Sequence, residues 1–274
     1  DYAQSKRKIY QHAKVCLFNS EDNLTTPRLS ATSDAQLVAF GPHQKNNPLL
    51  WSYNELSGEL LHHQQPFAEF SNFGLKGHHN ALNALAVSAL ASVLDIDVTQ
   101  KVDALSSYEG LIHRCQPIAS FAGVTFVDDS KATNVASAEA AIMGLVKHKN
   151  ILLLAGGDAK GAELNELSST ISSHVKKVFA FGKDKAQFSQ FVAPMQLSLV
   201  NTLEEAVKDA FAIAAPGDVV LLSPACASID MFSNYQARAA AFKSAVVGLQ
   251  TEHEQQTSTQ DKAQTSAPVE ADHE

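Results

Sequence analysis

Short apolar runs alternate with longer amphipathic segments along the second half of the chain. Strands separated by helical segments of this length predict a largely parallel sheet with helices on both faces. We therefore expect an α/β fold and a compact domain over residues 111–250. The expected strands are residues 123–127, 151–155, 178–181, 197–200 and 219–222, and the expected helices are residues 164–174, 184–192, 202–214 and 232–249.

The first 110 residues have a more mixed pattern. Strands are expected at residues 13–19 and 37–41, with two or three antiparallel strands within residues 49–75. A helix rich in Ala and Leu follows at residues 80–94, and a second helix at residues 99–108. Because the pattern changes near residue 110, residues 1–110 are expected to belong to a separate domain.

The segment 251–274 carries six acidic residues, one lysine and almost no apolar side chains. Such a segment cannot bury enough surface to fold, so we expect a disordered polar tail. It holds −5 of the formal charge of −8, which leaves −3 for the other 250 residues. A near-neutral body without a basic patch argues against nucleic-acid binding.

Cysteine usage and hydropathy predict a reduced, cytoplasmic protein. Cys16, Cys115 and Cys226 are far apart and lack metal-ligand spacing. No apolar run approaches the roughly 18 residues of a membrane span, and nothing resembles a signal peptide. The chain begins without Met in a segment that has the pattern of a helix interior, so we expect a fragment of a longer protein.

The most informative polar segment is residues 128–134, Asp-Asp-Ser-Lys-Ala-Thr-Asn, at the end of an expected strand. Ligands of α/β folds bind at such strand ends. The alternative is a polar turn that caps the next helix, with Asp129 or Thr133 as the N-cap. Lys131 would then lie in the first helical turn, where a cation opposes the helix dipole. A bound anion would explain its presence.

Two other polar or small-residue loops follow expected strands. The glycine-rich segment 156–161 contains Lys160, a candidate partner for a carboxylate or phosphate, although a tight strand-to-helix turn also explains the glycines. Segment 223–228, Ser-Pro-Ala-Cys-Ala-Ser, precedes a helix and could form an anion pocket. No base is spaced to activate Cys226, so we do not expect it to be a nucleophile.

Side chains suited to a nucleotide occur before residue 115. Asn80 and Asn83 share a helix face from which two amides could contact a base, with helix capping and local bonding as the alternative. Arg114 could hold a phosphate, although a surface ion pair is the usual role of a lone arginine. His78 and His79 lack a third ligand, so we do not expect a metal site there.

Five segments, in their order and spacing, resemble the Mur ligases, and within them the branch that adds D-glutamate to UDP-N-acetylmuramoyl-L-alanine. The segments are residues 77–84, 110–114, 128–134, 154–160 and 223–230. The resemblance covers residues 1 to about 249. It implies the C-terminal part of a central ATP-binding domain over residues 1–110, followed by a C-terminal Rossmann-like ligase domain over residues 111–250.

The resemblance also implies an activity. Such an enzyme uses ATP and Mg²⁺ to phosphorylate a carboxylate of the nucleotide substrate, and the amine of D-glutamate then attacks the acyl phosphate. The reaction belongs to peptidoglycan precursor synthesis and is expected in a cytoplasmic monomer that acts on small molecules. The phosphate loop would lie upstream of this chain, so the fragment alone is expected to be inactive.

Site residues follow from the resemblance position by position. Lys131 would lie beside the reacting groups as a catalytic residue. Lys6 aligns with a lysine that the family carbamylates, and its carbamate would assist catalysis by helping to bind Mg²⁺; the sequence alone shows only a solvated helix lysine. The family often has Phe where Tyr235 stands. The contacts with ATP would come from Asn80, Asn83, Arg114 and Asp129, and those with D-glutamate from Thr133, Lys160, Ser228 and Tyr235.

Two alternatives stay open on the sequence. One is another Mur ligase or a folylpolyglutamate synthase-like ligase, which a change of amino-acid substrate would distinguish. The other is a non-catalytic nucleotide- or carboxylate-binding Rossmann module. In that case Lys131→Ala in the full-length protein should leave ligation intact, whereas the ligase hypothesis predicts a severe loss.

Overall fold

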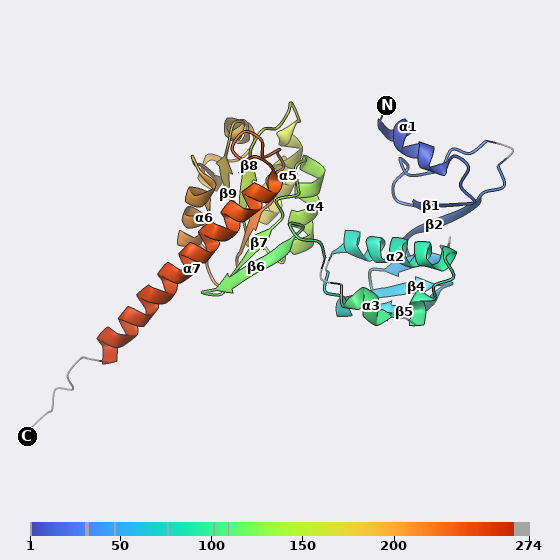
Figure 1. Ribbon diagram of the computed structural model, residues 1–274, viewed down its shortest axis with the longest axis horizontal. Helices are drawn as coiled ribbons and strands as arrows, with labels where there is room; N and C mark the ends of the chain where they lie inside the picture. Colours follow the sequence, from blue (N-terminus) through green and yellow to red (C-terminus); the bar gives the residue numbers. More distant parts are fainter. Residues whose placement is uncertain are drawn as a thin grey trace, which may run out of the picture. The chain divides into compact units, whose positions relative to one another are not determined.

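The computed structural model describes residues 2–265 except 31, 32, 47, 76, 101 and 109. The chain divides into two compact units, Asp1–Gly110 and Leu111–Glu274. Each unit has its own sheet, as Figure 1 shows, and each also has its own core of buried side chains. The expected α/β class, with a largely parallel sheet in the second unit, is confirmed.

The first unit is built on a five-stranded sheet in the order β1-β2-β3-β4-β5. Strands β1 to β3 are parallel, and β4 and β5 continue the sheet in antiparallel pairs. Helix α2 (His78–Val93) packs on β1, β2 and β3, with Ala81, Leu85 and Ala89 fully buried. The strands are β1 (Val15–Asn19), β2 (Gln36–Pro42), β3 (Trp51–Asn54), β4 (Glu59–His62) and β5 (Gln65–Glu69), and the short helices are α1 (Tyr2–Arg7) and α3 (Val102–Ser106).

The second unit contains a six-stranded sheet in the order β10-β9-β8-β11-β7-β6. All neighbouring strands are parallel except β6, which pairs antiparallel with β7 at the edge. The strands are β6 (Gln116–Phe121), β7 (Val124–Asp128), β8 (Ile151–Gly156), β9 (Val175–Phe181), β10 (Leu197–Leu199) and β11 (Val219–Leu222). The helices are α4 (Val135–Leu145), α5 (Ser168–His174), α6 (Leu203–Ala212) and α7 (Tyr235–Thr265).

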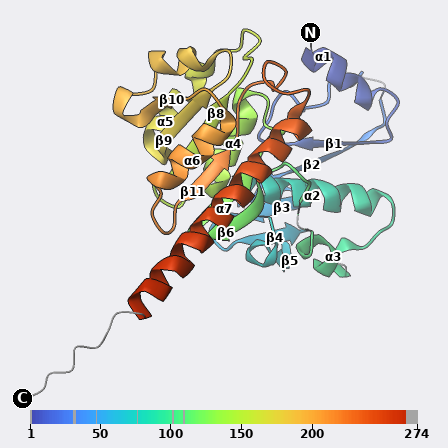
Figure 2. The ribbon, with the colours of Figure 1, turned by 60° about the vertical axis from the view of Figure 1, so that its left-hand side comes forward.

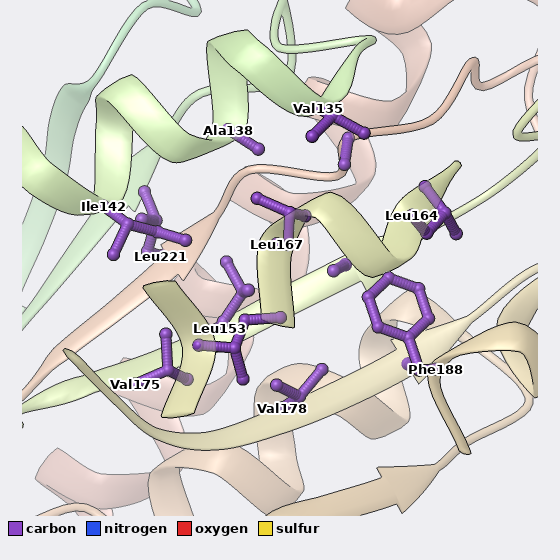
Figure 3. Close-up of a cluster of buried hydrophobic side chains, with 14 of the residues drawn as sticks. Val135, Ala138, Ile142, Leu153, Leu164, Leu167, Val175, Val178, Phe188 and Leu221 are labelled. Carbon is purple, nitrogen blue, oxygen red and sulfur yellow. The ribbon is translucent and has the colours of Figure 1, made fainter. Parts of the chain in front are cut away.

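Helices cover both faces of this sheet, and strand β8 shows the consequence in its sequence (Figure 2). All six residues of β8 are buried. Ile151, Leu153 and Ala155 face the core formed with α4 and α5, part of which is drawn in Figure 3. Leu152 and Leu154 face the core formed with α6 and α7. A continuous apolar run is therefore required, because alternate residues enter different cores.

Strand β11 lies between β8 and β7, and this arrangement creates a switch point in the sheet. After β8 the chain continues to α5 on one face, whereas after β11 it continues to α7 on the other face. The two loops diverge at the carboxyl edge of adjacent strands. Ligands of open α/β sheets bind at this kind of place.

Strand β6 was not expected from the sequence. Pro117 interrupts its pattern, but β6 is an edge strand, where a missing N–H costs no ladder bond. Ala122 and Gly123 both have positive φ and connect β6 to β7 in a tight turn. A sequence pattern does not show whether a strand lies at an edge.

The expectation of a disordered tail is wrong for residues 251–265, which extend helix α7. The ring of His253 lies 5.7 Å from that of Phe211 and 6.0 Å from that of Phe121, between ring centroids. Gln250 also donates a hydrogen bond to Glu254. The composition of this segment excludes a new hydrophobic core. A helix that has already formed can nevertheless continue through it, because each added residue gains a backbone hydrogen bond without the cost of nucleation. Residues 266–274 lie outside the described residues.

Within the part of the chain that the structure describes, no helix combines the length and the apolar character needed to cross a membrane.

Shortening α7 tests where its packing ends. A chain ending at residue 257 keeps the His253 contacts, so its free energy of unfolding should stay within about 0.5 kcal/mol of the original. A chain ending at residue 249 loses them and should be destabilised by about 1 kcal/mol. Urea denaturation of the three chains measures both differences. Equal stability of all three would show that His253 does not anchor the helix.

Candidate active site

The second unit gathers most of the expected site residues at one edge of its sheet. Because β7, β8 and β11 are parallel, their carboxyl ends meet at the same edge. The loop after β7 carries Lys131 and Thr133, the loop after β8 carries Lys160, and the loop after β11 carries Ser228. An antiparallel bridge between Asp158 and Ala227 joins the last two loops directly.

Five aspartates lie at this edge, and each accepts a hydrogen bond from a backbone N–H group. These carboxylates hold loop backbone in place, while the ammonium groups of Lys131 and Lys160 belong to exposed residues. This explains how an edge rich in acids can still present cations to an anion. The bonds run from Ser130 N to Asp128 (2.9 Å), Cys115 N to Asp129 (3.2 Å), Lys160 N to Asp158 (2.9 Å), Ala159 N to Asp184 (2.8 Å) and Lys183 N to Asp230 (2.8 Å).

His113 fixes the loop that carries Lys131. Its Nδ1 lies 2.7 Å from a carboxylate oxygen of Asp128, and its backbone oxygen accepts the Lys131 N–H at 3.2 Å. The His113 ring also meets the ring of Tyr235 edge-on at 5.9 Å. The Lys131 ammonium lies over that same ring, 4.3 Å from its centroid. Two expected site residues, Lys131 and Tyr235, are therefore in direct contact.

The alternative of a capping turn named the wrong cap residue. Asn134 is the N-cap of α4, and its side chain accepts the Ser137 N–H at 2.9 Å. Neither Asp129 nor Thr133 has this role. Asn can cap a helix as well as Asp can, and it stands closer to the apolar helix. Lys131 thus precedes the cap and does not oppose the dipole from within the first turn.

Asp129 is buried, with 6% of its surface exposed. One carboxylate oxygen accepts the Ser223 hydroxyl at 2.7 Å and the other accepts the Cys115 N–H. Loss of water raises the pKa of Asp129 to about 6, although these two hydrogen bonds oppose the shift. Only a small part of the carboxylate is therefore left to contact a ligand such as a ribose.

The glycines after β8 are required by close backbone approaches. A Cβ at Gly156 would lie 2.0 Å from the Phe181 carbonyl oxygen, and one at Gly157 would lie 2.2 Å from the Ala227 carbonyl oxygen. The loops after β8, β9 and β11 are thus packed backbone to backbone. Lys160 follows with a positive φ of 51°. A tight turn and a presented lysine are both present, so the two interpretations of this loop are compatible.

Ser228 and Arg114 differ in their access to a ligand. Ser228 is 4% exposed, and its carbonyl oxygen accepts N–H groups of Met231 and Phe232 at the approach to α7. Arg114 is exposed, and the described residues offer it no ion-pair partner within 4 Å. Burial raises the pKa of the Cys226 thiol to about 12, which agrees with the expectation that it is not a nucleophile.

The remaining expected site residues, Asn80, Asn83 and Lys6, lie in the first unit. Gly77 is the N-cap of α2, so Asn80 does not cap the helix, and the Asn83 amide donates to Asn80 Oδ1 at 3.4 Å. Lys6 is an exposed residue of α1.

His78 is held by two glutamates, with Nε2 at 2.8 Å from Glu21 and Nδ1 at 2.5 Å from Glu55. Burial lowers the pKa of His78, but these contacts outweigh it and raise the pKa above its usual value. Across the described residues, no group of three His, Cys, Asp or Glu side chains could hold a metal ion.

Arg238 is a residue of this region that the sequence reasoning missed. It is completely buried, and its guanidinium donates to the carbonyl oxygens of Ser130 at 2.9 Å and Cys226 at 3.1 Å. A signal was present, because Arg238, Phe242 and Val246 form one stripe at helical spacing. An arginine that continues an apolar stripe marks a buried charge.

Asp129→Asn tests how much the ionisation of the buried Asp129 carboxyl lowers the free energy of unfolding. A carboxyl with a raised pKa binds its proton more tightly in the folded state, so it adds stability at low pH that is lost as the pH rises from about 4 to about 6. The loss is on the order of 3 kcal/mol. The amide keeps the shape and cannot ionise, so Asp129→Asn should lack this part of the pH dependence. Denaturant unfolding of both proteins at pH 4 to 7 measures it, and parallel pH profiles would contradict the assignment.

Residues 113–226 match the family model described as Mur ligase, glutamate ligase domain. The chain is 41% identical over 242 residues to the UDP-N-acetylmuramoylalanine–D-glutamate ligase of Saccharophagus degradans, covering 86% of this chain and 52% of that protein. The chain spans about half the length of the curated relatives it matches.

Solved structures show the same fold. The UDP-N-acetylmuramate–alanine ligase MurC of Thermotoga maritima superposes with a TM-score of 0.62 at 17% identity, covering 92% of this chain and 55% of that one. The MurF ligase of the same organism, in complex with ADP, has a TM-score of 0.52 at 18% identity, covering 78% and 49%. The matched domain, the similarity along the chain and the shared fold agree: this chain belongs to the Mur ligase family.

Proposed function

We propose that the longer protein containing this chain is an ATP-dependent UDP-N-acetylmuramoylalanine–D-glutamate ligase of peptidoglycan precursor synthesis. The observation that carries the proposal is the carboxyl edge of the second unit. There the loops bearing Lys131, Lys160 and Ser228 meet, and the first two of these residues lie within the segment 113–226 that matches a glutamate ligase domain. Such an enzyme joins D-glutamate to the nucleotide substrate through an acyl phosphate. We further propose a cytoplasmic monomer.

Two sets of donors at this edge are suited to the two carboxylates of D-glutamate. Lys160 and Thr133, both exposed, would bind one carboxylate. Ser228 and Tyr235 would bind the other, with the serine contributing through the small part that remains exposed. Fixing both ends of the amino acid orients its amine, and orientation of this kind can supply a large part of a rate enhancement.

Lys131 is the proposed catalytic cation. Its backbone N–H is held by His113 and its ammonium lies against the Tyr235 ring, so its position is restricted at both ends. A positive charge fixed beside the reacting carboxylate stabilises the negative charge that develops as the amine attacks.

The residues assigned to the nucleotide fit it by their chemistry. Bound ATP would supply the phosphoryl group that activates the substrate carboxylate. The Asn80 and Asn83 amides are suited to a base edge, the exposed Arg114 guanidinium to phosphate, and the remaining edge of Asp129 to a ribose hydroxyl.

Among the described residues no group of three His, Cys, Asp or Glu side chains could hold a metal ion, and Mg²⁺ is usually bound by one or two carboxylates together with substrate phosphates and water. A carbamate on Lys6 would add one oxygen ligand, and the others would come from outside this set.

Phosphate release tests the proposed function. The full-length protein, given ATP, Mg²⁺ and UDP-N-acetylmuramoyl-L-alanine, should release phosphate when D-glutamate is added. L-Glutamate, L-alanine and L-lysine should not serve. Use of another amino acid would favour a different ligase of the family, and no amino-acid dependence would favour a non-catalytic binding module. The present chain alone should show no turnover.

Two substitutions separate the proposed roles. Lys131→Ala in the full-length protein should lower kcat by about 10²–10³-fold, because it removes charge stabilisation of the transition state. Lys160→Met should raise KM for D-glutamate by about tenfold or more, because it removes one ionic contact. Lys243→Met, an exposed change on α7, is the matched control and should leave both constants unchanged. Wild-type kinetics for Lys131→Ala would refute its catalytic role.

A further inference from the structure

Arg238 is a buried cation, and the stability of the fold alone does not explain why a cation is present there. It is 0% exposed, and its two hydrogen bonds go to backbone carbonyls and not to a carboxylate. Its Nε is also buried and has no hydrogen-bond partner among the described residues. Transfer of an ion out of water is costly, and a well-packed apolar residue often replaces a buried charge without loss. Phe242 and Val246 continue the same stripe as apolar residues.

The two carbonyls that Arg238 holds belong to different loops of the candidate site. Ser130 directly precedes Lys131 in the loop after β7, and Cys226 lies two residues before Ser228 in the loop after β11. β7 and β11 are adjacent strands, so the guanidinium joins two neighbouring loops at their roots. Its planar, rigid fork suits this task, because two fixed N–H groups define a distance between two acceptors.

Helix α7 holds Lys131 at two points. Arg238 binds the carbonyl of the preceding residue, and Tyr235, three residues earlier on the same helix face, lies under the Lys131 ammonium. The start of α7 thus determines where both the backbone and the side chain of Lys131 lie. Burial lowers the pKa of Arg238 to about 10, so the group stays charged at neutral pH and its bonds to the carbonyls remain charge-assisted.

We propose that Arg238 is a positioning residue of the ligase site, which ties the loop 128–134 to the loop 223–230 so that Lys131 lies beside the reacting groups while Ser228 binds the amino-acid substrate. The proposal rests on the proposed function for its catalytic meaning. The tie itself is a property of the second unit and can be tested separately.

Kinetics of the full-length protein test the catalytic meaning. Arg238→Met should lower kcat by about 10²-fold, because a small displacement of a reacting group costs that much. Added guanidinium ion should restore part of the lost rate by occupying the vacated space, whereas a merely structural defect would not respond. Arg238→Lys keeps the charge but offers no rigid fork, and its rate should be intermediate. Lys243→Met removes a charge from the exposed side of the same helix and should have wild-type rates.

Hydrogen exchange in the present chain tests the tie without any ligase assay. The hydrogen-bonded amides of Lys131, Ala132 and Ala227 should exchange at least tenfold faster in Arg238→Lys than in the wild type, while the amides of β8 should not change. If Arg238→Met does not fold, Arg238→Lys supplies both the kcat measurement and the hydrogen-exchange measurement.

Wild-type exchange and wild-type kcat in Arg238→Lys and Arg238→Met would overturn the proposal. Faster exchange with unchanged kcat would overturn its catalytic meaning. A wild-type protein without ligase activity would refute the proposed function instead, and the exchange result would still decide whether the tie exists.

Discussion

The second unit depends on one topological constraint, the insertion of β11 between β8 and β7 in a sheet covered on both faces. The insertion makes neighbouring strands send their chains to opposite faces. Their carboxyl ends are left beside each other, with room for loops that carry polar groups. The proposed D-glutamate site follows from this. The apolar strands fix the edge, and the edge fixes which loops can act on one ligand.

The loops at this edge divide their charges between two tasks. Aspartates accept backbone N–H groups and determine loop shape, while Lys131 and Lys160 remain available to a ligand. Arg238 also holds loop backbone in place, because its guanidinium donates hydrogen bonds to two backbone carbonyl oxygens. Charge counted along the sequence is therefore a poor guide to the potential of the site. The bonded carboxylates keep their negative charge, but the backbone fixes their positions, so the local arrangement of charges and not their sum determines where a cation is presented.

The sequence predicted the parts of the fold that depend on local pattern. The run at residues 151–155 and the alternation of strands with helices indicated a doubly covered parallel sheet, and the loops at their ends indicated the site. The parts that failed depend on tertiary context. Pro117 is tolerated because β6 lies at an edge, and α7 continues past residue 250 because His253 packs on Phe121 and Phe211. The role of Arg238 requires two loops that are 96 residues apart, at Ser130 and Cys226, to meet, which no local pattern reveals.

The central claim is that D-glutamate binds at the carboxyl edge of the second unit, where Lys160 contacts one of its carboxylates and Lys131 lies beside the reacting groups. Lysine modification measures it most directly. The full-length protein, with ATP and UDP-N-acetylmuramoyl-L-alanine bound, is treated with an amine-reactive reagent in the presence and in the absence of D-glutamate. The extent of modification of each lysine is measured by mass spectrometry. D-Glutamate should protect Lys131 and Lys160 from modification. It should not protect the exposed control residues Lys208 and Lys243, and L-glutamate should protect none of the four lysines. Equal modification with and without D-glutamate, or equal protection by both enantiomers, would contradict the claim.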